Sequence, residues 1–354
     1  MIPDEDAVEA MVLGGAFLGG GGGGSLEEGR KLGSAAIRLG KPDIVPIDSL
    51  PGESLLATVS AVGAPAAREK LVRQEDYIRA VRLLQERTGE RIAGLISSEN
   101  GALSTVNGLI QSAALGLPVV DAPCNGRAHP TGIMGSMALG ELPGFISRQA
   151  AVGGNAETGR HLELCVDAPL ARADALVRQA AVEAGGLVAV ARNPVQAGYV
   201  RTHGARGAIS MAVQLGRLLM ANRSAGGETV ARKLALAIGG EIEGCGQVAR
   251  LELETRGGYD LGRLTVEDLD LTFWNEYMTL ERSGERLATF PDLICTLDAA
   301  DGTPRTSASL SSGAWVIVVS VPRKNLILGA GMRLPAADRV VEEVVKAQKQ
   351  KQTG

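Results

Sequence analysis

Three short apolar segments alternate with helix-like segments between residues 54 and 122, and this order is the strongest constraint on the fold. SLLATVSAVGAP (54–65), RIAGLIS (91–97) and LPVVDA (117–122) have the lengths and compositions of buried strands. QEDYIRAVRLLQERTG (74–89) and STVNGLIQSAALG (104–116) have helical apolar spacing and end on a glycine. This strand–helix–strand order predicts a mainly parallel sheet with helices on its faces.

The pattern changes at Gly239. Before it, GGLVAVARNPV (185–195) repeats the strand pattern, and three helix-like segments follow it. After it, short β-rich runs alternate with GG, SG, DG and SSG turns, which predicts an antiparallel β domain, a small barrel or sandwich. The tail from residue 339 to 354 is predicted to be a helix with a basic, solvated end.

We therefore predict an α/β fold made of two domains. The first is a layered α/β domain with a mainly parallel sheet, over residues 1–165. The second covers residues 166–354 and has an α/β lead-in and a mostly antiparallel β-rich core at about 239–332.

Composition excludes several classes of function. The net charge of −4 lacks the basic excess of a nucleic-acid-binding protein. No run of 18 apolar residues is free of charges or glycine clusters, so no membrane span is expected, and the acidic start MIPDEDAVEAM is unlike a signal peptide. The four cysteines lack CxxC spacing, which argues against a disulfide framework and indicates a reducing, cytoplasmic location.

Reactive side chains gather in two loops. DAPCNGRAHPTG (121–132) follows an apolar strand and holds an acid, a thiol, an amide, a guanidinium and an imidazole, although the chain has only three histidines and four cysteines. SSENGALST (97–105) follows the neighbouring strand. Because ligands bind at the carboxyl ends of parallel strands, the two loops should share a pocket. The candidates are Glu99, Asn100, Asp121, Cys124, Asn125, Arg127 and His129.

Each reactive residue also has a structural interpretation. Asp121 either caps a turn or contacts the ligand. Cys124 is either a packing thiol or a nucleophile, and a thiolate would be favoured by the nearby Arg127 and His129. Arg127 either binds a carboxylate or imide oxygen or pairs with Asp121 or Glu99. His129 precedes a proline on an irregular loop, which makes a role in chemistry as plausible as a structural one.

A divalent metal such as zinc is the competing hypothesis for this loop. Asp121, Cys124 and His129 are ligand types that zinc accepts, and Glu99 or His203 would complete the set. Their spacing matches no specific zinc signature, so the metal site is the less favoured alternative.

The six consecutive glycines, 19–24, form a loop, because such a run is neither helix nor strand, and Ser25 then caps a helix. Gly22 and Gly23 are candidates for a nest of N–H groups that binds an anion. The alternative is a hinge or a close backbone approach to the other loops. The run has neither the spacing of a dinucleotide fingerprint nor the ending of a P-loop.

The second domain offers one more candidate. Acids in β strands are usually exposed or cap turns, but Glu276 lies in the unusual run WNE, directly after Trp274 and Asn275. We therefore include Glu276 among the substrate-binding candidates, facing a cleft between the domains.

These segments together resemble a bacterial family called S-methyl thiohydantoin desulfurase-like, whose genes often accompany hydantoinase and oxoprolinase genes. The similarity covers nearly the whole chain. It is carried by the glycine-rich loop, SENGALSTVN, LPVVDA with the following GRA and proline, RNPVQAGYVRTHGARGAISMAVQLG, LELETRGGYDLG, FWNEYM and PDLI.

The resemblance implies chemistry on small cyclic imides or their thio-analogues, in which attack at a ring C=N or C=O carbon expels a thiolate or opens the ring. Cys124 or a metal-bound water would then attack, His129 or Glu99 would transfer protons, and Asn100, Asn125 and Arg127 would hold ring oxygens. A non-catalytic ligand-binding or partner subunit of a hydantoinase- or oxoprolinase-like system is the alternative. A homo-oligomer and a partner of that type are expected as candidate assemblies.

Overall fold

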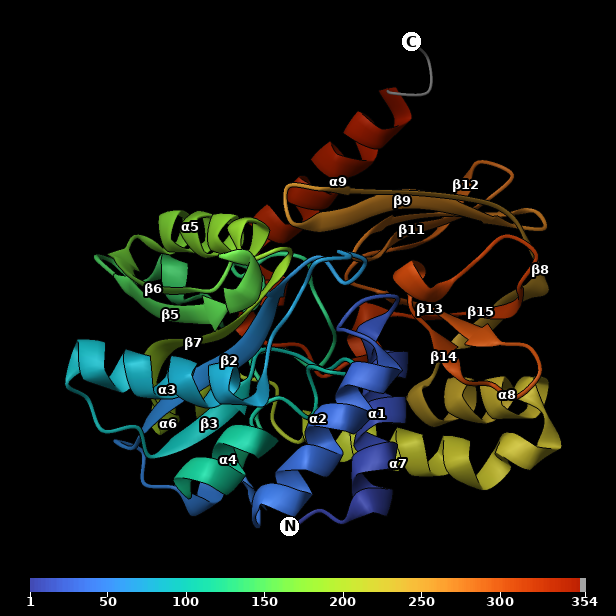
Figure 1. Ribbon diagram of the computed structural model, residues 1–354. Helices are drawn as coiled ribbons and strands as arrows, with labels where there is room; N and C mark the ends of the chain where they lie inside the picture. The colour runs from blue at the N-terminus through green and yellow to red at the C-terminus, as the bar shows by residue number, and fades with distance from the viewer. Residues whose placement is uncertain (351–354) are drawn as a thin grey trace.

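The computed structural model describes residues 1–350, and it contains two β sheets (Figure 1). The predicted α/β class is confirmed, with a helix-covered mixed sheet in the first half of the chain and an all-antiparallel sheet in the second. The first sheet contains, in spatial order, β1 (Ile44–Val45), β4 (Val119–Val120), β3 (Gly94–Ser97), β2 (Leu55–Gly63), β7 (Leu187–Gln196), β5 (Ser147–Gly153) and β6 (Leu162–Ala168).

The parallel part of this sheet is the part that the strand–helix–strand order predicts. β1, β4, β3 and β2 pair in parallel, whereas β7, β5 and β6 pair antiparallel beyond β2. The segment β7 therefore belongs to the first sheet, although it follows residue 165. The domain division at residue 165 remains a prediction.

Local sequence explains the helices next to the sheet. α3 (Gln74–Thr88) ends at Gly89, whose left-handed backbone (φ 69°) suits a glycine. α4 (Leu109–Leu115) begins five residues later than the helix predicted from residue 104. Polar side chains in this segment bond to nearby groups instead, since Thr105 accepts from the backbone N–H of Gly101 and donates to Asn100.

Helices cover both faces of the first sheet. One face is packed by α2 (Leu26–Leu39), α3 and α4, which share a core cluster with β2 and β3. The other face is packed by α5 (Leu170–Glu183) and α6 (Ala197–His203). The carboxyl ends of β2 and β3 are left open between these layers.

The second sheet begins at Glu241, just after the predicted change at Gly239, and all of its pairings are antiparallel. Its spatial order is β12 (Glu285–Thr289), β11 (Glu276–Arg282), β10 (Leu269–Trp274), β9 (Tyr259–Val266), β8 (Glu241–Arg256), β15 (Trp315–Val321), β13 (Leu293–Asp298) and β14 (Pro304–Arg305). The long strand β8 pairs with both halves of the sheet, which share one apolar core.

Two helices join the sheets. α1 (Glu5–Gly19) and α7 (Ala208–Asn222) lie side by side, and α8 (Gly227–Ile238) packs with them against β13 and β15. α1 and α7 approach closely at glycines, since a methyl group on Gly14 would lie 1.8 Å from the carbonyl oxygen of Ala212. Gly216 makes the equivalent approach to Ala10.

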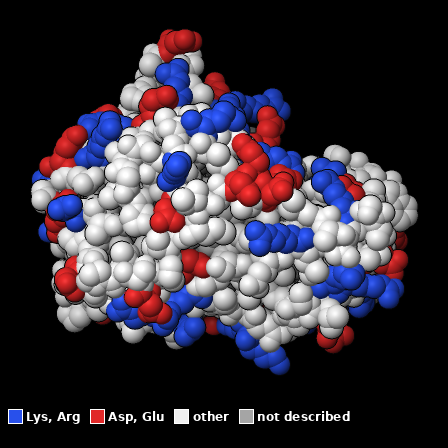
Figure 2. Space-filling model, turned by 90° about the horizontal axis from the view of Figure 1, so that it is seen from below, with Lys and Arg blue, Asp and Glu red and all other residues white. Residues whose placement is uncertain are grey.

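The C-terminal helix α9 (Pro335–Gln350) extends away from the body (Figure 1), and its Val341 and Val345 pack against the second sheet. The predicted basic end at 351–354 lies outside the described residues. Figure 2 shows basic and acidic side chains interspersed on one face, with broad uncharged areas between them. Across residues 1–350, no helix is both long enough and apolar enough to cross a membrane.

Candidate functional site

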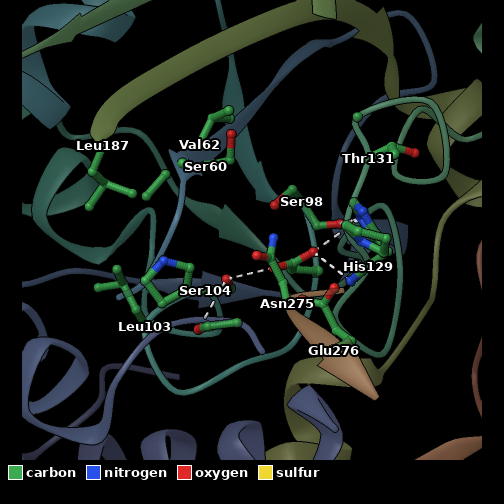
Figure 3. A pocket seen from close by; sticks show the side chains of 18 of the residues that line it. Ser60, Val62, Ser98, Leu103, Ser104, His129, Thr131, Leu187, Asn275 and Glu276 are labelled. Carbon is green, nitrogen blue, oxygen red and sulfur yellow. Dashed lines mark hydrogen bonds and ion pairs between the residues drawn. The ribbon is translucent and has the colours of Figure 1, made fainter. Parts of the chain in front are cut away.

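A small pocket of about 70 Å³ lies where the first sheet, the glycine loop and the second sheet meet. Its walls come from the carboxyl end of β2, from the loops that follow β3 and β4, and from the start of β11. Figure 3 shows Ser98, Ser104 and His129 around the pocket, with Asn275 and Glu276 of the second half of the chain close to them. A volume of this size has room for a few water molecules or one small ring.

The glycine loop contacts both halves of the molecule. Its carbonyl oxygens accept from both sides, since Gly23 accepts from the backbone N–H of Leu103 and Gly20 accepts from that of Tyr277. A methyl group on Gly22 would lie 1.9 Å from Oε1 of Glu276. The glycine run therefore allows close backbone approach, which was the structural alternative considered for it, and Gly23 also lines the pocket.

Glu276 is a buried acid at the junction. Its residue is only 2% exposed, and its Oε2 has no hydrogen-bond partner among residues 1–350. Burial raises the pKa of this carboxyl well above its ordinary value, the charge of Glu99 raises it further, and Arg127 opposes the shift. Burial therefore favours the protonated form of Glu276, which lines the pocket.

The backbone conformation of Asn275 orients the neighbouring Glu276. Asn275, between β10 and β11, has φ 58°, a left-handed conformation that asparagine tolerates better than most residues. The conformation is held from both sides, because the Asn275 side chain accepts from the backbone N–H of Asp260 and its carbonyl accepts from Ser307. The WNE run thus places Glu276 in the lining of the pocket.

Glu99 and His129 form a pair that also lines the pocket. Nε2 of His129 lies 3.2 Å from Oε2 of Glu99, which also accepts from the backbone N–H of His129. Oε1 of Glu99 accepts from Ser104 at 3.0 Å. Burial lowers the pKa of His129 below its ordinary value, against the opposing effect of Glu99, so the imidazole is neutral at neutral pH.

A buried cation completes the lining. Arg192, on β7, is 4% exposed and lines the pocket. Its nearest ion-pair partner is Asp174, at the long N–O distance of 3.8 Å. Arg192 is therefore a buried cation in the pocket lining, with a guanidinium of the kind that binds carboxylate and carbonyl oxygens.

Arg178 links three segments of the chain at the rim of the pocket. Its guanidinium donates to the carbonyl oxygens of Gly63, Pro130 and Gly258, which come from three separate segments, and it stacks over the ring of Tyr259. These bonds fix the β2 end, the loop after β4 and the β8–β9 hairpin relative to one another.

Several predicted residues position the loops rather than line the pocket. Asp121 accepts from the backbone N–H groups of Ile209 and Ser210, so it caps the N-terminus of α7. Asn100 donates to the carbonyl of Ala208, and Asn125 donates to that of Arg127.

Cys124 and Arg127 are fully buried beside the site. The sulfur of Cys124 contacts the Thr58 hydroxyl at 3.3 Å, and burial raises the pKa of its thiol to about 11. Arg127 donates to the carbonyl oxygens of Pro291 and Asp292 and lies over the ring of Phe290. Neither side chain lines the pocket, so burial favours the packing interpretation of Cys124.

The candidate metal ligands do not come together. Asp121 caps α7, Cys124 contacts Thr58, and His203 stacks on the Tyr199 ring with 3.9 Å between centroids. Within residues 1–350 no group of three or more His, Cys, Asp or Glu side chains is arranged to hold a metal ion.

Sequence reasoning missed Arg192, Arg178, Lys70 and Ser60, all of which line the pocket. A usable signal existed for Arg192, because it interrupts the otherwise apolar run GGLVAVARNPV in a strand predicted to be buried. No comparable signal marks Ser60 or Lys70, whose positions depend on where the surrounding loops fold.

The fold and the site define an α/β protein with two β sheets and a small pocket where the two sheets and the glycine loop meet. Family models of the S-Me-THD-like N-terminal domain and the S-Me-THD-like C-terminal domain match residues 6–156 and 168–332. The chain belongs to this S-Me-THD-like family, as the sequence resemblance predicted.

One solved structure with a similar fold is the crystal structure of a protein from Chromobacterium violaceum. The TM-score is 0.72 at 22% identity, and the alignment covers 100% of this chain and 96% of that one. This similarity shows the fold. No curated protein matches the chain.

Proposed function

We propose that the protein is a hydrolase of small cyclic imides such as a hydantoin or an S-methyl thiohydantoin, and that the junction pocket is its active site. Family membership supports a role in thiohydantoin metabolism. The observation that carries the proposal is that a buried acid, Glu276, and the buried His129–Glu99 pair line one pocket, where burial raises the pKa of Glu276 and lowers that of His129. Opposed acid and base groups of this kind are typical of proton-transfer catalysis.

The chemistry starts with water addition. The Glu99–His129 pair removes a proton from a water molecule as its oxygen bonds to the ring carbon that carries the S-methyl group. Glu276 donates its proton to the ring nitrogen of the same C=N bond. Arg192 donates to a ring oxygen and stabilises the negative charge that develops on it.

Collapse of the tetrahedral intermediate completes the reaction. The carbon–sulfur bond breaks, and the sulfur leaves as methanethiol with the proton held by the Glu99–His129 pair. The new hydroxyl becomes the ring carbonyl and returns its proton to Glu276. One water is consumed, and one hydantoin and one methanethiol are formed.

The test is methanethiol release from S-methyl thiohydantoin, measured with a thiol reagent and corrected for protein thiols. Glu276→Gln should lower kcat by about 10²-fold or more, the range for loss of a positioned proton donor. Glu285→Gln makes the same change on the exposed strand β12 and should leave kcat unaltered.

Binding separates this proposal from a ligand-binding subunit. Calorimetric binding of the same compound by the wild-type protein, without turnover, would support the non-catalytic alternative. Turnover that survives unchanged in Glu276→Gln would overturn the proposed mechanism.

A further inference from the structure

A second, larger space adjoins the proposed active-site pocket. This space, of about 460 Å³, lies between α2, the segment 70–73 and the start of α3. Four residues line both spaces and therefore form the wall between them: Glu28, Lys70, Leu103 and Leu187. We call the larger space the α2–α3 groove.

Two charged side chains, Lys70 and Glu28, form part of the wall between the pocket and the groove. Nζ of Lys70 lies 3.0 Å from Oε1 of Glu28 and donates to the carbonyl of Pro65 at 2.6 Å. Both side chains are partly exposed, at 21% and 33%, so either one can swing into water without leaving a buried charge. Lys70 also lies in a segment without helix or strand between β2 and α3.

Beyond the wall, the lining of the groove mixes apolar and charged residues. Leu32 from α2, Leu71 and Val72 from the connecting segment, and Tyr77 from α3 supply its apolar part, beside charged residues such as Lys31 and Glu75. The apolar part of this lining can contact an alkyl or aryl group that enters from the pocket.

We infer that the substrate ring carries an alkyl or aryl substituent, which crosses between Glu28 and Lys70 and lies in the α2–α3 groove. The inference rests on the proposed function, and it adds the substrate class. The pocket, at about 70 Å³, is filled by the ring, so a substituent on the ring carbon needs the adjoining space. Leu103 and Leu187 flank the crossing and would contact its first carbon atoms.

The test compares two substrates in the full-length protein: unsubstituted S-methyl thiohydantoin and its 5-benzyl derivative. The wild-type protein should have the higher kcat/KM for the 5-benzyl compound. Val72→Trp fills the groove from a residue that does not line the pocket, and it should lower the benzyl-to-unsubstituted ratio by about tenfold or more.

Controls keep the result interpretable. Gln74→Trp narrows the groove from an exposed position, so it tests the same idea with little risk to folding. Val182→Trp adds the same bulk to an exposed position on α5, away from the groove, and should leave the ratio unaltered.

Two failures are distinguishable. If the wild-type protein neither binds nor converts either compound, both the proposed function and this inference are overturned. If it converts both, but Val72→Trp and Gln74→Trp leave the ratio at the wild-type value, the groove assignment alone is wrong.

Discussion

A methyl group on Gly22 would lie 1.9 Å from Oε1 of Glu276, so the glycine loop and the buried acid of the second sheet meet with no space for a side chain. The backbone of Gly22 does not need a left-handed conformation, and the constraint at this position is therefore contact alone. The glycine loop is in direct contact with the acid that we propose as the proton donor.

Gly22→Ala should therefore displace Glu276. Forcing a methyl group into a filled site costs about 1–3 kcal/mol of stability, and misplacement of the acid should lower kcat as well. In the double variant Gly22→Ala/Glu276→Ala, much of the stability loss should disappear, because the clashing carboxyl is gone. Urea unfolding of the four proteins of this cycle measures the coupling, and strictly additive losses would contradict the contact.

Glu276→Gln should change the dependence of stability on pH. The unfolded chain ionises this carboxyl near pH ~4.3, whereas the native protein keeps it protonated to a higher pH. Wild-type stability therefore falls as pH rises from the unfolded pKa towards the raised native pKa, by about 1.4 kcal/mol per unit of difference. Glutamine does not ionise and has no such cost. The free energy of unfolding of the variant, relative to that of the wild type, should therefore increase between pH 4 and pH 7.5.

Thermal or urea unfolding at both pH values measures this gain. Glu285→Gln, on the exposed edge of the same sheet, is the matched control and should differ from the wild type by the same amount at each pH. A constant difference for Glu276→Gln as well would show that Glu276 ionises normally in the folded protein.

The rate should have a bell-shaped dependence on pH. Activity should be lost at low pH as His129 gains a proton, with the loss centred below pH ~6.5, the ordinary histidine pKa. It should be lost at high pH as Glu276 releases its proton. Profiles of kcat/KM report these ionisations in the free enzyme, and an acid limb centred above pH ~6.5 would argue against the neutral imidazole.

Arg192→Met should impair catalysis more than binding. If the guanidinium stabilises charge that develops on the ring oxygen, kcat should fall by about 10²–10³-fold while KM changes less. Arg172→Met, on the exposed face of α5, is the control. Equal losses of ground-state affinity and kcat/KM, with kcat intact, would make Arg192 a binding group only.

Cys124 should be unreactive in the native protein. Its thiol is fully buried and its pKa is raised to about 11, whereas Cys245 is exposed. Iodoacetamide followed by peptide mapping should label Cys245 first and Cys124 only after unfolding. Cys124→Ala should retain most of the turnover, and rapid native labelling of Cys124 together with loss of turnover in that variant would restore the nucleophile hypothesis.

Local patterns were sufficient for most of the fold. The spacing of apolar residues predicted β2, α3 and β3. The change at Gly239 to short β-rich runs separated by turns located the start of the antiparallel sheet within two residues. These elements depend on neighbours along the chain, which a sequence contains. The helix before Leu115 was predicted too long, since side-chain bonds to the local backbone competed with the helix there.

The sequence by itself determined the family, the two kinds of sheet, and the loops in which Glu99 and His129 lie, because these follow from local order and composition. Only the tertiary structure decided which reactive side chains share the pocket. Asp121, Cys124 and Arg127 are as close in sequence as His129 is, yet each contacts a distant partner: the start of α7, Thr58 and the Pro291 carbonyl. Arg192 and Glu276 reach the pocket from other strands, because long-range packing of the two sheets, not spacing along the chain, brings them there.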